Sequence, residues 1–296
     1  MRRLEGSMVA IVTPMKDGAV DLPALRELVE WQLFEGTDGI VPCGTTGEGT
    51  TLTAAERAEV IKATVETVRG RVAVVAGAGS NATHEAIDSV RMAKELRADA
   101  ALVVTPYYNK PTQEGLYRHY LAIWEAARFP VVAYNVPSRT SVDLLPETVA
   151  RLVKAGAIVG IKEATASLER QLQLVEKVGR EAIAFLSGDD FTILPYIACG
   201  GHGVISVVAN IAPRAVKELV GAARRGDLAV ALDRQARMGE LNRMMFVETN
   251  PGPVKAALAL LGRASGEVRL PLAPVSDANL LKIREAMVRF GLVAAA

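Results

Sequence analysis

The chain has 296 residues, of which 50% are hydrophobic and 23% are charged, and its formal net charge at pH 7 is +1. This composition is typical of a soluble globular protein that is long enough to bury a substantial core. No long basic or acidic block points to nucleic acid or a membrane surface as a partner, and no run of 18 apolar residues could span a membrane.

Short apolar runs alternate with amphipathic helical patterns over the first 225 residues. Runs typical of buried strands lie at 8–13, 39–42, 72–76, 100–104, 130–134, 157–161, 183–186 and 203–207. Helical patterns lie at 21–35, 53–69, 82–97, 112–127, 146–154, 167–179, 189–199 and 213–224. Residues 53–56 are predicted to form a capping box. Ser167 is predicted to cap a helix that turns Leu168, Leu172 and Val175 inward.

Eight strand-then-helix units in succession favour a parallel sheet. An open doubly wound sheet could hold them, but eight is the number that closes a (β/α)8 TIM barrel. Residues 226–296 show no strand pattern and are predicted to form helices at 227–246, 252–262 and 277–290. We therefore expect an α/β protein with a barrel over 1–225, which carries the active site, and a C-terminal helical region over 226–296.

The carboxyl ends of the predicted strands carry most of the polar and glycine-rich motifs. In a barrel of this kind these ends meet on one face, where active sites lie. The motifs occupy residues 42–49, 105–109, 134–140, 162, 187–190 and 200–206.

Lys162 follows directly after the apolar run at 157–161. A lysine at a strand end usually points to solvent and has no special role. The alternative is an amine held partly out of water. At an ordinary pKa of about 10.4, only about one lysine in 2,500 is a free amine at pH 7. A desolvated amine can form a Schiff base with a carbonyl.

Hydroxyl and guanidinium groups near Lys162 suit the chemistry of an imine. Tyr134, on the neighbouring predicted strand, could move protons, and Thr45 and Tyr108 could relay them. Thr46 and nearby backbone amides could hold a carboxylate, and Arg139 could grip a second one. Each feature alone is more often packing, a turn or a solvated side chain. Their location at one end of one barrel favours a site.

Other candidates are weaker. Cys43 and Cys199 give no disulfide framework and suggest a reducing cytoplasm, with Cys43 as a structural thiol. The apolar run near the N-terminus is too short for a signal peptide. The three histidines lack metal-ligand spacing, so no metal is expected. Residues 77–82 match a dinucleotide fingerprint, but a tight turn needs glycines anyway, so no cofactor is expected. Asp189 and Asp190 fit a helix N-terminus.

Taken together, the motifs at 44–48, 107–109, 134–140, 160–163, 187–190 and 200–206 resemble those of the 4-hydroxy-tetrahydrodipicolinate synthase (dihydrodipicolinate synthase) family, within the superfamily of class I pyruvate-dependent aldolases and N-acetylneuraminate lyase. The resemblance covers essentially the whole chain. It implies a lyase that condenses pyruvate with L-aspartate 4-semialdehyde, in the first committed step of lysine and diaminopimelate biosynthesis. It also implies a cytoplasmic homotetramer built as a dimer of dimers.

The resemblance assigns a role to each matching residue. Lys162 would form the pyruvate imine and Tyr134 would transfer protons. Thr45 and Tyr108 would complete the relay, with the residue matching Tyr108 reaching in from a partner subunit. The residues that would bind substrate are Thr46, Arg139, Ile205 and Gly188.

Two questions stay open at this point. Asn81, Glu85 and Tyr107 match a lysine-binding allosteric pocket, but Ala54 and Arg57 stand where lysine-inhibited members carry histidines, so feedback is not expected. A related pyruvate-dependent sugar-acid lyase or dehydratase is the main alternative activity, and the sialic-acid lyases among these relatives usually lack an arginine matching Arg139. A keto-acid sensor and a nicotinamide enzyme are more distant alternatives.

Overall fold

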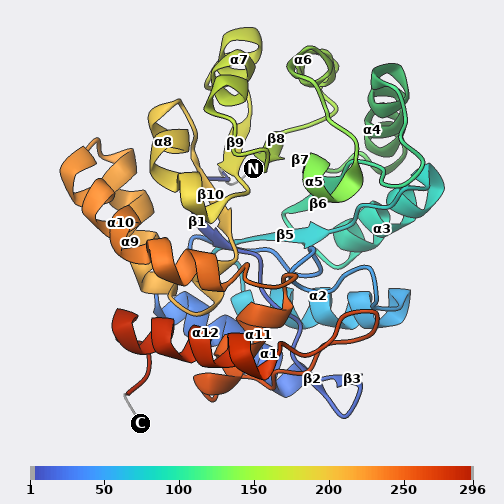
Figure 1. Cartoon of the computed structure of the whole chain (residues 1–296). Coiled ribbons are helices and arrows are strands. Elements are labelled where there is room, and N and C mark those ends of the chain that lie inside the picture. The colour runs from blue at the N-terminus through green and yellow to red at the C-terminus, as the bar shows by residue number, and fades with distance from the viewer. Residues whose placement is uncertain (1–3, 295–296) are drawn as a thin grey trace.

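Eight parallel strands close into a barrel in the order β1-β10-β9-β8-β7-β6-β5-β4, as the computed structural model of residues 4–294 shows (Figure 1). The strands are β1 (Gly6–Val9), β4 (Gly39–Ile40), β5 (Ala73–Gly77), β6 (Ala100–Val104), β7 (Val131–Asn135), β8 (Gly160–Glu163), β9 (Ala184–Ser187) and β10 (Gly203–Ser206). The predicted (β/α)8 barrel is confirmed.

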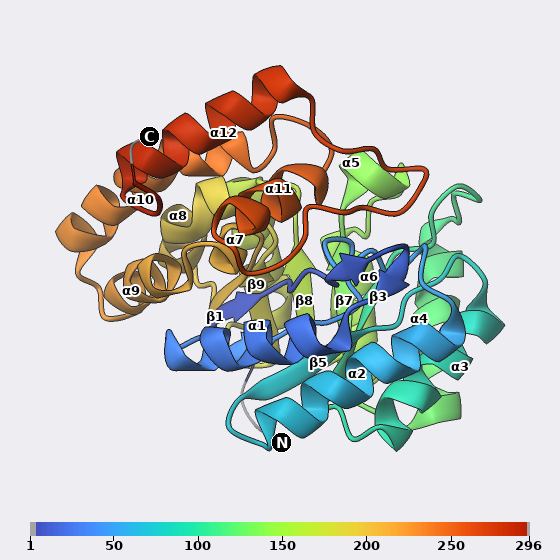
Figure 2. The same cartoon turned by 90° about the horizontal axis from the view of Figure 1, so that it is seen from below.

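Helices surround the barrel because the connection from each parallel strand to the next is helical, and α9 follows the last strand. They are α1 (Leu22–Phe34), α2 (Ala54–Val68), α3 (Thr83–Glu95), α4 (Gln113–Ala127), α6 (Pro146–Lys154), α7 (Leu168–Val178), α8 (Ile193–Ala198) and α9 (Pro213–Arg224). Three more, α10 (Leu228–Met244), α11 (Gly252–Leu260) and α12 (Asp277–Phe290), follow in sequence and lie together along one side of the barrel (Figure 2). Within residues 4–294 no helix is both long and apolar enough to cross a membrane.

Helix ends largely follow the sequence signals, but one predicted helix face is wrong. The capping box at the start of α2 forms, and the Ser167 hydroxyl accepts a hydrogen bond from the Arg170 amide at the start of α7. Leu172, expected to face inward, is 54% exposed. Gln171 and Leu174 are the residues of α7 that are buried, because they occupy the side of the helix that faces the barrel.

Strand β8 starts three residues later than its apolar run. Gly156 has a φ of +70°, and the amide of Ala157 still donates to Leu152, so these residues complete the turn that ends α6. The ladder to β7 begins where the Val159 amide donates to Val131. Lys162 therefore lies inside a strand and not just beyond its end.

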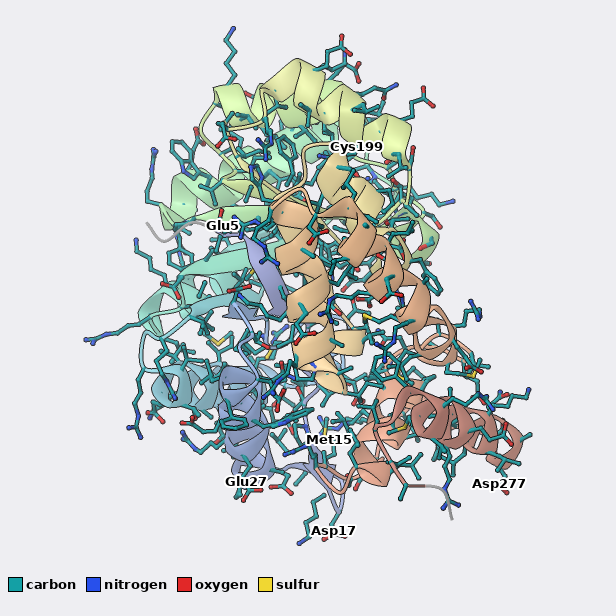
Figure 3. The ribbon with its side chains drawn as sticks, turned by 90° about the vertical axis from the view of Figure 1, so that its left-hand side faces the viewer. Glu5, Met15, Asp17, Glu27, Cys199 and Asp277 are labelled. Atoms are coloured by element: carbon teal, nitrogen blue, oxygen red, sulfur yellow. The ribbon has the colours of Figure 1, made fainter. Side chains whose placement is uncertain are left out.

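Several short elements carried no recognisable pattern. They are a hairpin, β2 (Met15–Lys16) and β3 (Ala19–Val20), the short helix α5 (Pro137–Thr140), and the 3₁₀ turn η2 (Val208–Asn210). The helix predicted at 189–199 forms as the 3₁₀ turn η1 (Asp190–Thr192) followed by α8. Asp17, at the tip of the hairpin, lies at the edge of the molecule (Figure 3). The hairpin is held there by the C-terminal segment, because Glu267 accepts from the Gly18 amide and Arg269 donates to the Gly18 carbonyl.

Candidate active site

Lys162 and Tyr134 lie directly opposite each other on adjacent strands, β8 and β7. Lys162 is only 6% exposed and Tyr134 7% exposed. The Lys162 Nζ lies 4.4 Å from the centroid of the Tyr134 ring. The fold therefore excludes the interpretation of Lys162 as a solvated strand-end lysine, and it brings an amine and a phenol together inside the barrel.

Gly188, just after β9, leaves the space that the Lys162 side chain occupies. A Cβ at position 188 would lie 3.0 Å from the Lys162 Cε and 2.7 Å from the Ala164 Cβ. The Gly188 amide donates to the Glu163 carbonyl at 2.7 Å, which holds this turn against the end of β8. Any larger residue at position 188 would press on the amine-bearing side chain.

The loop after β4 brings Thr45 and Thr46 to the same end of the barrel. Thr46 is buried, and its hydroxyl accepts a hydrogen bond from the Asn250 Nδ2 at 3.0 Å. The exposed Arg139, on α5, donates to the Asn250 carbonyl at 3.4 Å. Asn250 thus joins two predicted substrate-binding residues. Sequence reasoning missed it because Asn250 and Thr46 are 204 positions apart.

A buried ion pair fixes the same loop to the C-terminal helices. The Lys255 Nζ, on α11, lies 2.5 Å from the Glu48 Oε1, and both side chains are fully buried. The Glu48 Oε2 also accepts from the Arg269 amide at 2.9 Å. The segment beyond the barrel therefore supports the loop that carries Thr45 and Thr46.

A cavity of about 490 Å³ opens beside Tyr134 and Thr45 and extends to Glu85 and Tyr107. The Asn81 Nδ2 donates to the Tyr107 carbonyl at 3.2 Å, so the three candidate allosteric residues lie close together.

Two residues that depart from the lysine-inhibited pattern, Ala54 and Arg57, line the same cavity. The Arg57 Nε is buried and has no hydrogen-bond partner among residues 4–294.

The remaining predicted residues are spread around the barrel. Ile205 is buried on β10, opposite Met8 of β1. Tyr108 has a φ of +74° and its side chain is 89% exposed. Within one chain, Tyr108 does not line the cavity that contains Tyr134 and Thr45.

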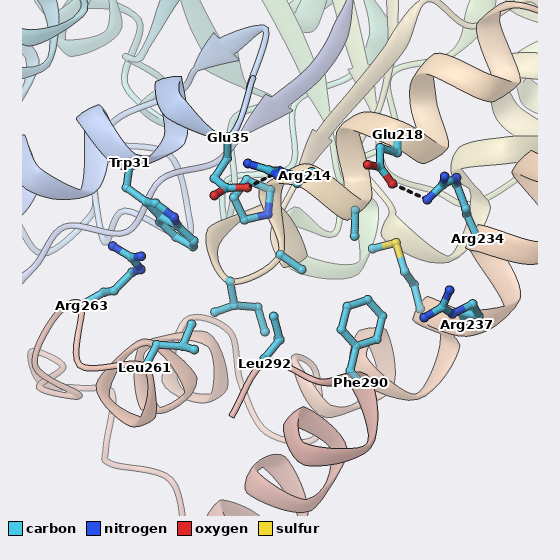
Figure 4. A pocket seen from close by; sticks show the side chains of 15 residues that line it. Trp31, Glu35, Arg214, Glu218, Arg234, Arg237, Leu261, Arg263, Phe290 and Leu292 are labelled. Atoms are coloured by element: carbon cyan, nitrogen blue, oxygen red, sulfur yellow. Dashed lines mark hydrogen bonds and ion pairs between the residues drawn. The ribbon is translucent and has the colours of Figure 1, made fainter. Parts of the chain in front are cut away.

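A second cavity, of about 470 Å³, lies away from these strand ends, between α1, α9, α10 and the C-terminal segment (Figure 4). Its apolar walls include Trp31, Met238 and Phe290. Ion pairs such as Glu35 with Arg214 lie at its edge. It contains none of the predicted site residues.

Local packing accounts for the weaker candidates. Burial raises the pKa of the Cys43 thiol to about 12, which makes it a poor nucleophile. A Cβ at Gly77 would lie 2.1 Å from the Cys43 carbonyl oxygen, and one at Gly79 would lie 2.5 Å from the Val104 amide nitrogen. These glycines are required for close backbone contact. Asp190 is buried and accepts from the Val207 and Val208 amides, so it joins η1 to the end of β10.

The closed barrel holds a buried lysine and a buried tyrosine side by side near the carboxyl ends of its strands, the face where (β/α)8-barrel enzymes carry their active sites. The family model described as the dihydrodipicolinate synthetase family matches residues 3–289. The chain belongs to this family.

Curated relatives and solved structures are similar to this chain over nearly its full length. The chain is 84% identical to the 4-hydroxy-tetrahydrodipicolinate synthase of Anaeromyxobacter dehalogenans (strain 2CP-C) over 292 residues, 99% of each chain. It is 55% identical to that of Geobacter sp. (strain M21), over 98% of this chain and 99% of the relative. Dihydrodipicolinate synthase from Aquifex aeolicus superposes with a TM-score of 0.96 at 46% identity, covering 98% and 99% of the two chains. The chloride-inhibited enzyme from Acinetobacter baumannii, complexed with pyruvate, has a TM-score of 0.95 at 46% identity and the same coverage.

Proposed function

We propose that Lys162 carries the reaction by forming an imine with pyruvate, which then adds to L-aspartate 4-semialdehyde. The chain is a lyase, a 4-hydroxy-tetrahydrodipicolinate synthase that forms 4-hydroxy-tetrahydrodipicolinate from these two substrates. The observation that carries the proposal is the position of the Lys162 Nζ, 4.4 Å from the Tyr134 ring centroid in a buried site.

Proton transfer in this scheme falls to hydroxyl groups. Imine formation expels water, so a proton must reach the leaving oxygen, and the Tyr134 hydroxyl is the donor that we propose. Thr45 lines the cavity beside Tyr134 and would pass the proton onward. The residues that we propose for substrate binding are Thr46, Ile205 and Gly188 for pyruvate and Arg139 for the carboxylate of the aldehyde.

The exposed Tyr108 would complete the relay from a neighbouring subunit. A tyrosine that is 89% exposed has a large apolar ring in water, which an intersubunit contact would cover. We accordingly propose a homotetramer, arranged as a dimer of dimers, in the cytoplasm. We also propose that the chain divides at residue 225 into the barrel and a C-terminal helical region that supports it.

The cavity beside the active site would serve as an effector pocket formed by Asn81, Glu85 and Tyr107. We propose that lysine is a poor effector here, because Ala54 supplies no polar group and Arg57 brings a cation next to a cationic ligand. Turnover measured with and without lysine tests this directly. Strong inhibition by lysine would contradict it.

Trapping with borohydride tests the imine. Incubation with pyruvate and borohydride should add one reduced pyruvate adduct per chain, which peptide mapping should locate at Lys162. Tyr134→Phe should slow trapping by roughly 10²–10⁴-fold, the range for loss of a general acid–base group. Arg139→Ala should weaken only the aldehyde-dependent rate. An unmodified Lys162 would refute the mechanism, and an unchanged rate in Arg139→Ala would favour a sugar-acid lyase.

A further inference from the structure

The residues that follow Tyr134 and Lys162 form a second pair on the outer face of the barrel. Side chains alternate along a strand, so Asn135 and Glu163 point away from the barrel interior. They lie directly opposite each other on β7 and β8, as the reacting pair does one position earlier. Asn135 is 0% exposed and Glu163 only 2% exposed. A buried polar pair therefore lies immediately behind the proposed catalytic pair.

Hydrogen bonds use most of the polar atoms of this outer pair. The Asn135 Nδ2 donates to the Glu163 Oε2 at 3.1 Å and to Oε1 at 3.3 Å, and the Thr165 amide donates to Oε1 at 2.9 Å. The Asn135 Nδ2 also donates to the Asp143 Oδ1 at 2.9 Å, while its Oδ1 accepts from the Leu144 amide at 2.9 Å. One asparagine thus joins two strands and the segment between α5 and α6.

Helix α7 closes the network from outside. The Arg170 guanidinium pairs with Asp143 and donates to the Leu144 carbonyl at 2.9 Å. Burial raises the pKa of Glu163. The hydroxyl of Tyr196, on α8, is buried without a partner among the described residues, and burial together with the Glu163 carboxylate raises its pKa. Among residues 4–294 the Tyr196 hydroxyl thus makes no hydrogen bond to the link between the strands.

We propose that Asn135 and Glu163 are positioning residues that set the geometry of Tyr134 and Lys162. This inference rests on the proposed roles of that reacting pair. Asn135 and Glu163 are the last paired residues of β7 and β8. The backbone hydrogen bond next to this pair is the one that the Asn135 carbonyl accepts from the Ala164 amide at 3.0 Å. The cross-strand side-chain bonds tie the two strand ends where the reacting groups are mounted. A misplacement of about 1 Å in such a pair can cost roughly 10²-fold in rate.

Asn135→Leu tests the proposal, because leucine has a similar size but can neither donate nor accept. We expect kcat and the rate of imine trapping to fall by about 10–100-fold, with KM for pyruvate within about threefold because the carboxylate-binding groups are untouched. Tyr196→Phe is the matched control, since it alters a neighbouring buried side chain that makes no bond in the network. It should keep the kinetics of the unmodified protein. Thermal unfolding of each variant reports how much protein is folded at the assay temperature.

Exchanging donor and acceptor gives a second test that does not depend on Asn135→Leu folding. Asn135→Asp places two carboxylates opposite each other, and Glu163→Gln places two amides there. The double variant restores the donor–acceptor pair across the two strands that Asn135→Asp lacks, so its kcat should exceed that of Asn135→Asp. A kcat for Asn135→Leu at the unmodified level, or a loss that matches only the unfolded fraction, would overturn the inference while leaving the imine mechanism intact. Failure of the unmodified protein to be trapped at Lys162 would overturn both.

Discussion

Removing one partner of the buried Lys255–Glu48 pair should destabilise the chain far more than removing both. In Lys255→Met the Glu48 carboxylate would stay fully buried and keep only the hydrogen bond from the Arg269 amide. An uncompensated buried charge typically costs about 3–5 kcal/mol. The total free energy of unfolding of a protein is only about 5–15 kcal/mol. The melting temperature should therefore fall by roughly 6–20 °C, at about 2–4 °C per kcal/mol.

The double variant Lys255→Met with Glu48→Gln separates the charge from the shape. A glutamine at position 48 can still accept from the Arg269 amide but leaves no buried charge, so the double variant should unfold at a higher temperature than Lys255→Met alone. Circular dichroism during thermal and urea unfolding measures the melting temperature and the free energy of unfolding of Lys255→Met and of the double variant. The reasoning fails if Lys255→Met stays within about 1 kcal/mol of the unmodified protein, a loss typical of an exposed pair, or if the two substitutions simply add.

Three further outcomes are expected. Gly188→Ala should reduce borohydride trapping at Lys162 at least about tenfold, because the new Cβ would lie 3.0 Å from the Lys162 Cε; unchanged trapping would show that the turn gives way. The hydrogen bond from Arg269 is the main reason that the pKa of Glu56 is lowered to about 2. The stabilisation of the folded state by the ionised Glu56 carboxylate is therefore complete above pH about 4.5 and is lost as the pH falls from about 4.5 toward 2. Urea midpoints of the unmodified protein and of Arg269→Met should converge over that window, and parallel curves would contradict this. Burial and a pKa of about 12 should make Cys43 resist iodoacetamide at pH 8 in the folded protein, with mass spectrometry locating any label on the other cysteine.

The sequence alone determined the architecture, because periodicity and caps are local properties of the chain. Eight apolar runs, each followed by an amphipathic pattern, were enough to predict the closed barrel. Local signals also predicted the helix starts at Thr53 and Ser167. The strand-end motifs placed Lys162 and Tyr134 on adjacent strands, because parallel order follows chain order in a barrel. The inward stripe of α7 was wrong at Leu172, since the contact face of a helix is set by its neighbours.

Only the tertiary structure decided which distant residues meet. Asn250 touches the Thr46 loop, and Lys255 pairs with Glu48, across more than 200 positions of sequence. No periodicity or spacing encodes such a contact, because it depends on how α11 packs against the barrel. The environment of Lys162 was undecided for the same reason, since a strand-end lysine can face water or the core. Closure of the barrel, and the strand register that sets Lys162 opposite Tyr134, bury it and place its amine against the ring.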